Sequence, residues 1–212
     1  MSLPIYLASR SPRRKELLAH AGLRFRVYVP KEEELAFPPS TRRETPSAIV
    51  KRIAGAKAAA AVKELAAAGR RSGVILAADT LVFLDGKVLG KPADAAEAKR
   101  MLKRLSGRRH EVQTGVACAL LGPKGAVKAS VISVRTGVEF FPLSDAWLDW
   151  YVGTGEPLDK AGAYGAQTFG AAMIRSFSGS YTNVVGLPVG ESLSLLEKVS
   201  GQTRTQLMEK KR

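Results

Sequence analysis

The spacing of hydrophobic and polar residues predicts alternating strands and helices from the start of the chain. An apolar run at residues 5–8 predicts a short buried strand. Ser11 and Pro12 then have the chemistry of a helix N-cap and first turn, and the helix is expected to stop near Gly22. A strand that leads into a helix amino terminus presents backbone N–H groups and a favourable dipole to an anion.

A second helix is expected from Pro46 to about Ala68, with Thr45 as its cap. Its apolar positions Ile49 and Ile53 are four residues apart, and the same step continues to Lys57. A lysine on an inward-facing stripe suggests an internal partner. The helix pattern alone favours the alternative, a lysine at the edge of the stripe whose amine reaches solvent.

A continuous apolar run at residues 74–78 predicts a central strand covered on both faces, which we expect to end at Asp79. Residues 81–84 and 87–89 flank Asp85-Gly86, a pair typical of a hairpin turn. Open α/β sheets place ligand-binding groups at the carboxyl ends of strands, which would give Asp79 and Thr80 a functional role. An acid that only caps a turn fits this pattern equally well.

The second half of the chain continues the mixture of strands and helices. The expected elements are a helix from Asp94 to Gly107, antiparallel strands over 112–121 and 126–141, a helix from Ser144 to Gly153, a strand at 172–174 and a last helix after Gly190. The sum is an α/β (α+β) fold in which helices flank a mixed central sheet, arranged in two lobes.

Composition restricts the setting of the protein. The 212 residues are 45% hydrophobic and 25% charged, enough for a packed core without disulfides. Cys118 is the single cysteine and lies in an apolar run, so we expect a core thiol in a reducing compartment. No secretory signal and no membrane-spanning run are evident, which favours a cytoplasmic protein without a membrane partner.

The net charge of +14 favours polyanionic partners, although solvated surface arginines explain such an excess equally simply. Aromatic residues are few and do not interleave with the basic pairs, so a specific nucleic-acid groove is not expected. His20 and His110 are isolated from each other and lack the spacing of a zinc site.

Three groups of residues could supply phosphoanhydride chemistry, which needs cations, a charge-accepting metal or acid, and a group to orient water. They are the Ser9, Ser11, Arg13 and Arg14 junction; Asp79 and Thr80 with the later Lys91; and the glycine-rich segment that carries Asp159, Lys160 and Gln167. Each has a plainer explanation, namely a capped helix with exposed arginines, a turn-capping acid, and a local ion pair of low energy.

In these residues the chain resembles the Maf (septum-formation inhibitor) nucleotide pyrophosphatases. The matching segments lie in the family's order at residues 7–18, 78–80, 90–92, 155–165 and 179–188. The resemblance covers nearly the whole chain and implies a single domain over 1–212, with an elongated mixed sheet and two lobes that have a cleft between them. It also implies a cytoplasmic, homodimeric enzyme that splits nucleoside triphosphates between the α- and β-phosphates.

The resemblance implies roles for individual residues. Asp79 is the proton acceptor, and Glu34 and Lys57 fall where the family has a further acid and lysine, which favours an inward role for Lys57. Our hypothesis is that Glu34 and Asp79 bind a divalent cation, Mg²⁺ or Mn²⁺, while Arg13, Arg14, Lys57 and Lys91 hold the phosphates.

Arg13, Thr80 and Gln167 match positions that select the base in the subgroup acting on dTTP and UTP. We therefore expect a house-cleaning pyrimidine nucleotide pyrophosphatase, with a link to cell-division arrest left open. The alternatives are a pyrophosphatase for 7-methyl-GTP or for inosine or xanthosine triphosphate, and a nucleic-acid-binding division regulator. Two loop segments, residues 38–40 and 168–172, depart from the family pattern.

Overall fold

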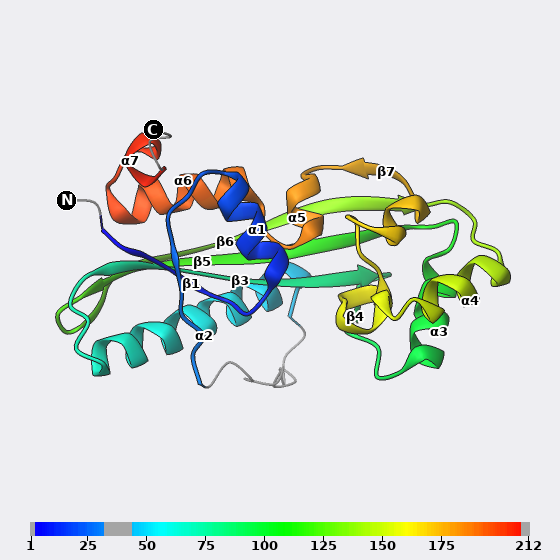
Figure 1. Cartoon of the computed structure of the whole chain (residues 1–212), viewed down its shortest axis with the longest axis horizontal. Coiled ribbons are helices and arrows are strands. Elements are labelled where there is room, and N and C mark those ends of the chain that lie inside the picture. Colours follow the sequence, from blue (N-terminus) through cyan, green and yellow to red (C-terminus); the bar gives the residue numbers. More distant parts are fainter. Residues whose placement is uncertain (1–2, 32–43, 209–212) are drawn as a thin grey trace. The chain divides into compact units, whose positions relative to one another are not determined.

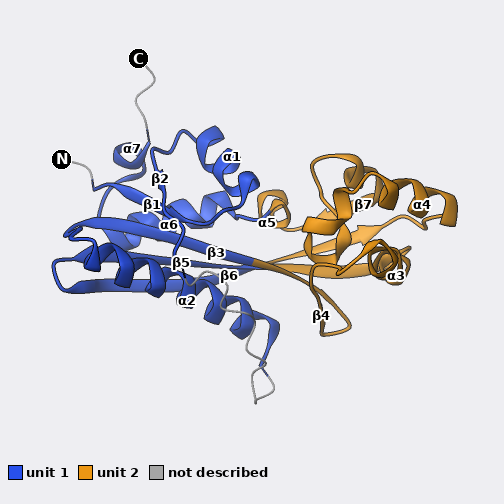
Figure 2. Cartoon of the chain, turned by 60° about the horizontal axis from the view of Figure 1, so that its bottom comes forward, with its two compact units in different colours: residues 1–79, 114–134, 186–212 blue, residues 80–113, 135–185 orange. Residues whose placement is uncertain are grey.

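The computed structural model describes residues 3–31 and 44–208. The chain forms two compact units built from interleaved segments. Unit 1 comprises residues 1–79, 114–134 and 186–212, and unit 2 comprises residues 80–113 and 135–185 (Figure 2). The prediction of two lobes agrees with this division, and the cleft between them stays a prediction.

A mixed sheet of seven strands is labelled in Figure 1, in the order β2-β1-β3-β5-β6-β7 with β4 paired to β3. Its strands are β1 (Ile5–Ala8), β2 (Arg26–Val27), β3 (Gly73–Leu84), β4 (Lys87–Leu89), β5 (Arg109–Gly122), β6 (Gly125–Phe140) and β7 (Ile174–Ser178). β1 is parallel to both β2 and β3, whereas β4 and β7 are antiparallel to their partners. The predicted mixed α/β fold is therefore confirmed.

The sheet of unit 1 is covered by helices on both faces. Alternate residues of β1 face opposite sides, as a pleated strand requires. Ile5 and Leu7 pack with α1 (Pro12–His20), α6 (Val189–Ser200) and α7 (Arg204–Leu207), whereas Tyr6 and Ala8 pack with α2 (Pro46–Ala67). Figure 1 shows the same arrangement, with α2 on one side of β1 and α6 on the other.

Small residues let α2 lie unusually close to the sheet. Ala54, Ala58 and Ala61 are buried against it, and a Cβ atom on Gly115 of β5 would lie 2.0 Å from the carbonyl oxygen of Val50. Both predicted ends of α2 are confirmed, since Thr45 caps the helix and Gly69 follows it with φ +76°. This close packing sets the distance between α2 and the strands, and therefore how far the α2 side chains reach across the sheet.

The prediction that the central strand ends at Asp79 is wrong. β3 continues without a break to Leu84 and includes Asp79 and Thr80 as half-buried positions inside the strand. The polar side chain is tolerated there because Asp79 is paired with a lysine of α2. The hairpin that follows is confirmed, and its turn residues Asp85 and Gly86 both have positive φ, as a type I′ turn requires.

In unit 2, helices pack against the parts of β3, β5 and β6 that belong to this unit, which are residues 80–84, 109–113 and 135–140. Its helices are α3 (Ala95–Leu105), α4 (Asp145–Gly153) and α5 (Tyr181–Val185), together with the 3₁₀ turns η1 (Glu156–Asp159), η2 (Ala161–Ala163) and η3 (Phe169–Met173). The predicted caps Asp94 and Ser144 are confirmed. The sequence did not predict α5, α7, β2 or the 3₁₀ turns, and the strand expected at 172–174 begins only at Ile174.

In the described part of the chain, no helix has the length and apolarity to cross a bilayer.

Candidate functional site

The first group of candidate residues lies where β1 leads into α1. Ser11 caps α1 by accepting a hydrogen bond from the backbone N–H of Arg14 at 3.4 Å, as the sequence predicted. The hydroxyl oxygen of Ser9 accepts from the backbone N–H of Ser11 at 3.2 Å. These bonds fix the turn between strand and helix, so the positive end of the α1 dipole lies directly beyond β1.

Arg14 ties this turn to a distant segment of unit 1. Its guanidinium is buried, and Nε donates to the carbonyl oxygen of Gly186 at 2.8 Å while Nη1 donates to Ser9 Oγ at 3.1 Å. Two of its donors are therefore engaged with the protein. Arg13, the residue before Arg14 on α1, is only half-buried, which makes it the more accessible of the two arginines predicted to hold phosphate.

The second group is an ion pair between α2 and β3. Lys57 Nζ donates to Asp79 Oδ1 at 2.6 Å, and the two side chains retain 16% and 18% of their accessible surface. The inward position of Lys57 is the one that the family resemblance favoured, whereas the helix pattern alone had favoured an amine that reaches solvent. The alternative, an amine directed to solvent at the edge of the stripe, does not fit this geometry. Coulomb attraction is stronger for such a half-buried pair than for an exposed one.

Both groups lie at the place where β1 ends. The register pairs Ala8 with Ala77, so the residues that follow β1 lie beside the segment that contains Asp79. By strand alternation Asp79 lies on the α2 face with Ala77, whereas Ser9 and Arg14 belong to the face covered by α1. Because β1 stops here, the edge of β3 is not covered by β1 from Asp79 onward.

The remaining predicted residues belong to unit 2. Lys91 is exposed just after β4, and Gln167 is exposed in the segment between η2 and η3. Lys160 Nζ pairs with Asp159 Oδ1 at 2.6 Å and also donates to the carbonyl oxygen of Glu156 at 2.7 Å. The local ion pair considered in the sequence is therefore present. Thr80 follows Asp79 along β3.

Glu156 is a residue whose position sequence reasoning did not single out. Its carboxylate accepts hydrogen bonds from Tyr151 Oη at 3.0 Å and from the backbone N–H groups of Phe169 and Gly170 at 3.3 and 3.4 Å. The backbone N–H of Gly165 donates to Tyr151 Oη at 3.2 Å. We call this network the Glu156 clamp; it holds both ends of the segment that carries Gln167.

Of the two predicted ligands of a divalent cation, only Asp79 lies among the described residues. Asp79 offers a hard carboxylate oxygen beside its bond to Lys57, and Mg²⁺ commonly binds proteins through only one or two carboxylates plus substrate phosphates. No group of three or more His, Cys, Asp and Glu side chains that could hold a metal occurs within residues 3–31 and 44–208. Glu34, the second predicted ligand, lies outside the described residues.

His110 and Cys118 are both buried in the core. Burial lowers the pKa of His110 to about 4, against a weaker opposing effect of the Arg108 backbone, and its Nε2 lies 2.8 Å from Tyr164 Oη. Burial raises the pKa of the Cys118 thiol to about 12, opposed by the charge of Lys128. Cys118 therefore lies in the core, as predicted, and holds almost no thiolate at neutral pH.

The fold and these residues define a class of protein: a mixed α/β protein in which a serine- and arginine-rich strand-to-helix junction and a half-buried Lys–Asp pair on the other face of the sheet both lie near the end of β1, a combination suited to phosphate groups. The comparison with known proteins gives the family. The chain belongs to the Maf-like protein family, whose model matches residues 4–199.

Relatives of known name are similar over nearly their full length. The chain is 47% identical over 198 residues to a dTTP/UTP pyrophosphatase of Anaeromyxobacter dehalogenans, covering 93% of this chain and 95% of the relative. It is 48% identical over 192 residues to a dTTP/UTP pyrophosphatase of Symbiobacterium thermophilum, covering 91% and 92%. A solved dITP/XTP pyrophosphatase of Mycobacterium abscessus aligns at 18% identity over 94% and 95% of the two chains, with a TM-score of 0.39.

Proposed function

We propose that this protein hydrolyses nucleoside triphosphates to the nucleoside monophosphate and pyrophosphate, with dTTP and UTP as its preferred substrates. The observation that carries the proposal is the near full-length similarity, at 47% and 48% identity, to relatives named dTTP/UTP pyrophosphatase. The Lys57–Asp79 pair supplies a chemical basis, because it combines a water-orienting carboxylate with a cation for phosphate charge.

In the proposed mechanism Asp79 accepts a proton from, or orients, the water that attacks the α-phosphorus. The α-phosphorus bond to the bridging oxygen breaks and pyrophosphate leaves. Lys57 lies within hydrogen-bond distance of Asp79, so its ammonium group can orient the carboxylate and meet a phosphate oxygen. Arg13 and the amino terminus of α1 add positive potential beyond the end of β1.

Arg14 has a supporting part in this scheme. Its buried bonds to Ser9 and Gly186 hold the turn in shape and thereby position the amino terminus of α1. Ser9 and Ser11 are bound into the same turn, so they can orient its backbone toward an anion.

A divalent cation, Mg²⁺ or Mn²⁺, is part of the proposal, with Asp79 and Glu34 as the residues that would hold it. When bound, such an ion would neutralise charge on the triphosphate oxygens. The donor set fits this ion, since a half-buried carboxylate completed by water and phosphate oxygens is the kind of site that Mg²⁺ uses.

The remaining family-derived roles are also proposals. Arg13, Thr80 and Gln167 would select a pyrimidine base, and Lys91, Asp159 and Lys160 would contact the nucleotide. Homodimeric assembly and a cytoplasmic location are proposed on the same similarity, and the buried reduced thiol of Cys118 fits a reducing compartment.

The test is a substrate panel with the purified protein and Mg²⁺ or Mn²⁺. We expect dTTP and UTP to give pyrophosphate and the monophosphate in equal amounts, with no orthophosphate. Faster hydrolysis of 7-methyl-GTP, inosine triphosphate or xanthosine triphosphate would overturn the pyrimidine preference. Release of orthophosphate instead of pyrophosphate would overturn the proposed position of cleavage.

A further inference from the structure

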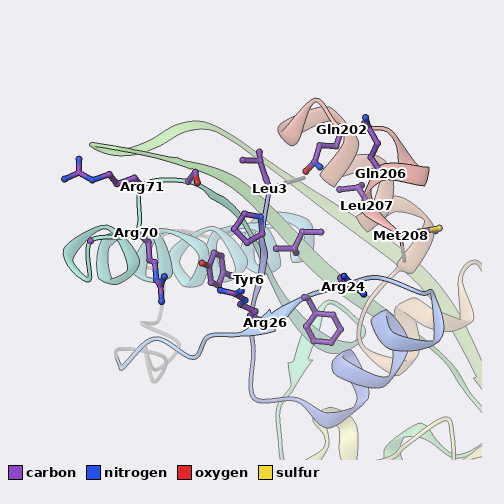
Figure 3. A pocket seen from close by; sticks show the side chains of 15 residues that line it. Leu3, Tyr6, Arg24, Arg26, Arg70, Arg71, Gln202, Gln206, Leu207 and Met208 are labelled. Atoms are coloured by element: carbon purple, nitrogen blue, oxygen red, sulfur yellow. The ribbon is translucent and has the colours of Figure 1, made fainter. Parts of the chain in front are cut away.

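A large open pocket lies in unit 1 where strands β1 and β3 begin, away from Asp79. Its volume is about 1010 Å³, and its lining comes from the amino end of β1, the segment after α1, the segment between α2 and β3, and the chain around α7 (Figure 3). β1 and β3 are parallel, and both begin at this pocket. Gly73 and Asp79 are six residues apart on β3, about 20 Å at ~3.3 Å per residue, so the pocket is separate from the Lys57–Asp79 pair.

Cations dominate the polar part of this pocket. Arg24, Arg26, Arg70 and Arg71 all line it, and none of the fifteen described residues that form its lining is acidic. In Figure 3, Arg24 and Arg26 follow one another along the segment after α1, and the guanidinium of Arg71 is directed outward. All four residues are exposed, so a ligand that enters from solvent can reach their side chains.

The charge of the whole chain is concentrated in the same unit. Unit 1 holds 22 Lys and Arg against 10 Asp and Glu, a net charge of +12, whereas unit 2 holds 11 against 9. The positive potential therefore extends beyond the pocket and would raise the local concentration of polyanions there.

The remaining lining is apolar or carries side-chain amides. Phe25 and Met208 offer half-buried apolar surface, and Gln202 offers an amide group, whereas the amide oxygen of Gln206 accepts a hydrogen bond from the backbone N–H of Thr203. The buried Oε1 of Gln202 has no hydrogen-bond partner within the described structure. A hydroxyl or N–H group on a ligand would therefore satisfy an acceptor that is otherwise unpaired.

We propose that this pocket is a second binding site, for a nucleoside triphosphate or other nucleoside polyphosphate, separate from the catalytic centre. The arginines match the several negative charges of a polyphosphate chain, for which the guanidinium fork is a suitable donor. The apolar and amide surfaces match a base and a sugar, and the volume is at the upper end of the range for small-molecule sites, about 300–1,000 Å³.

The experiment counts nucleotide sites by calorimetric titration with the α,β-methylene analogue of UTP, which resists cleavage between the α- and β-phosphates. We expect two sites per chain. Arg26→Ala/Arg70→Ala should weaken one of them about tenfold or more, because hydrogen bonds to charged groups are lost, while turnover is unchanged. Arg100→Ala/Arg104→Ala, which removes the same charge from exposed positions of α3, should leave both sites intact.

Competition tests the chemistry of the second site. Inorganic tripolyphosphate should displace the analogue from it, and uridine should not. A single site that is unaffected by Arg26→Ala/Arg70→Ala would overturn the proposal. Equal weakening by the two double variants would also overturn it, since the binding would then follow net charge alone. Binding of a fluorescent oligothymidylate, but not of the nucleotide analogue, at these arginines would overturn it in favour of nucleic acid.

Discussion

Lys57 is the residue whose position most directly joins the sequence pattern to the proposed chemistry. Its amine lies 2.6 Å from Asp79, so its removal leaves a half-buried carboxylate without its cation. We expect Lys57→Met, which keeps most of the aliphatic stem, to lower kcat/KM for UTP about 10²–10³-fold, the range for loss of one electrostatic stabiliser. Steady-state kinetics with pyrophosphate detection measures this effect.

Lys51→Met is the matched control, because Lys51 is exposed on the same helix. It should keep the parental kcat/KM. Unchanged kinetics in Lys57→Met would show that the lysine serves folding only.

His110 predicts how stability depends on pH. Burial lowers its pKa in the folded protein to about 4 from the ordinary value of 6.5, so the unfolded chain binds more protons than the folded one between these pH values. The free energy of unfolding therefore has its full value above about pH 6.5 and decreases as the pH falls toward 4, because protonation of the histidine then favours the unfolded chain. Between pH 7.5 and pH 5 this one group should remove about 2 kcal/mol from the free energy of unfolding.

Urea denaturation at the two pH values measures this loss. In His110→Gln, which cannot titrate in this range, the fall between pH 7.5 and pH 5 should be smaller by about 2 kcal/mol. An equal fall in both proteins would mean that His110 does not titrate as its burial requires.

Single residues were predictable where a regular spacing reveals them. The apolar neighbours of Cys118 indicated a core thiol, and the step of four along α2 marked Lys57 as a position on the apolar stripe, although only the family resemblance favoured its inward role. The roles of Arg14 and Glu156 could not be predicted, because their partners are brought together only by folding. Gly186 is 172 residues from Arg14 in sequence.

Among the elements, those with local capping signals were predicted best. Ser11, Thr45, Asp94 and Ser144 cap helices through hydrogen bonds to backbone N–H groups three residues ahead. The length of β3 was mispredicted because a carboxylate inside a strand normally marks its end. Only the tertiary contact with α2 explains why the strand continues.

The Glu156 clamp makes an element-scale prediction. Tyr151 Oη links Glu156 to the backbone N–H of Gly165, and the carboxylate holds Phe169 and Gly170. Glu156→Ala should destabilise the protein by about 1–3 kcal/mol, because donors lose a charged acceptor. If Gln167 contacts the base, KM for UTP should also rise while kcat changes little.

Thermal denaturation and steady-state kinetics separate the two effects. Tyr151→Phe, which removes the phenolic oxygen but keeps the ring, should show the same pattern more weakly. A fall in kcat with KM unchanged would contradict a role for the clamp in positioning the Gln167 segment.

For the whole molecule, the mixed sheet and the two-unit division followed from alternating strand and helix patterns. The interleaving of the units could not be predicted, since β3, β5 and β6 each contribute to both units without any break in their sequence pattern. The concentration of charge in unit 1 likewise becomes visible only once residues from three separate segments are assigned to one unit.

This charge predicts weak, unspecific attraction for nucleic acid. A random single-stranded oligonucleotide should bind in dilute buffer, and its affinity should fall steeply between 50 and 200 mM salt because counterion release drives the interaction. Fluorescence anisotropy over a salt series measures the slope. Salt-resistant, sequence-selective binding would instead favour the nucleic-acid-binding alternative.

The most direct test of the catalytic role of the Lys57–Asp79 centre is the turnover of Asp79→Asn, which preserves the shape of the side chain and removes its charge. Asp85→Asn is the matched control on the turn that follows the same strand, where φ is 52° and asparagine is well tolerated. With dTTP and UTP, we expect Asp79→Asn to lose about 10²–10⁴-fold in kcat with unchanged thermal stability, and Asp85→Asn to match the parent. Parental turnover in Asp79→Asn would contradict the assignment of this carboxylate to catalysis.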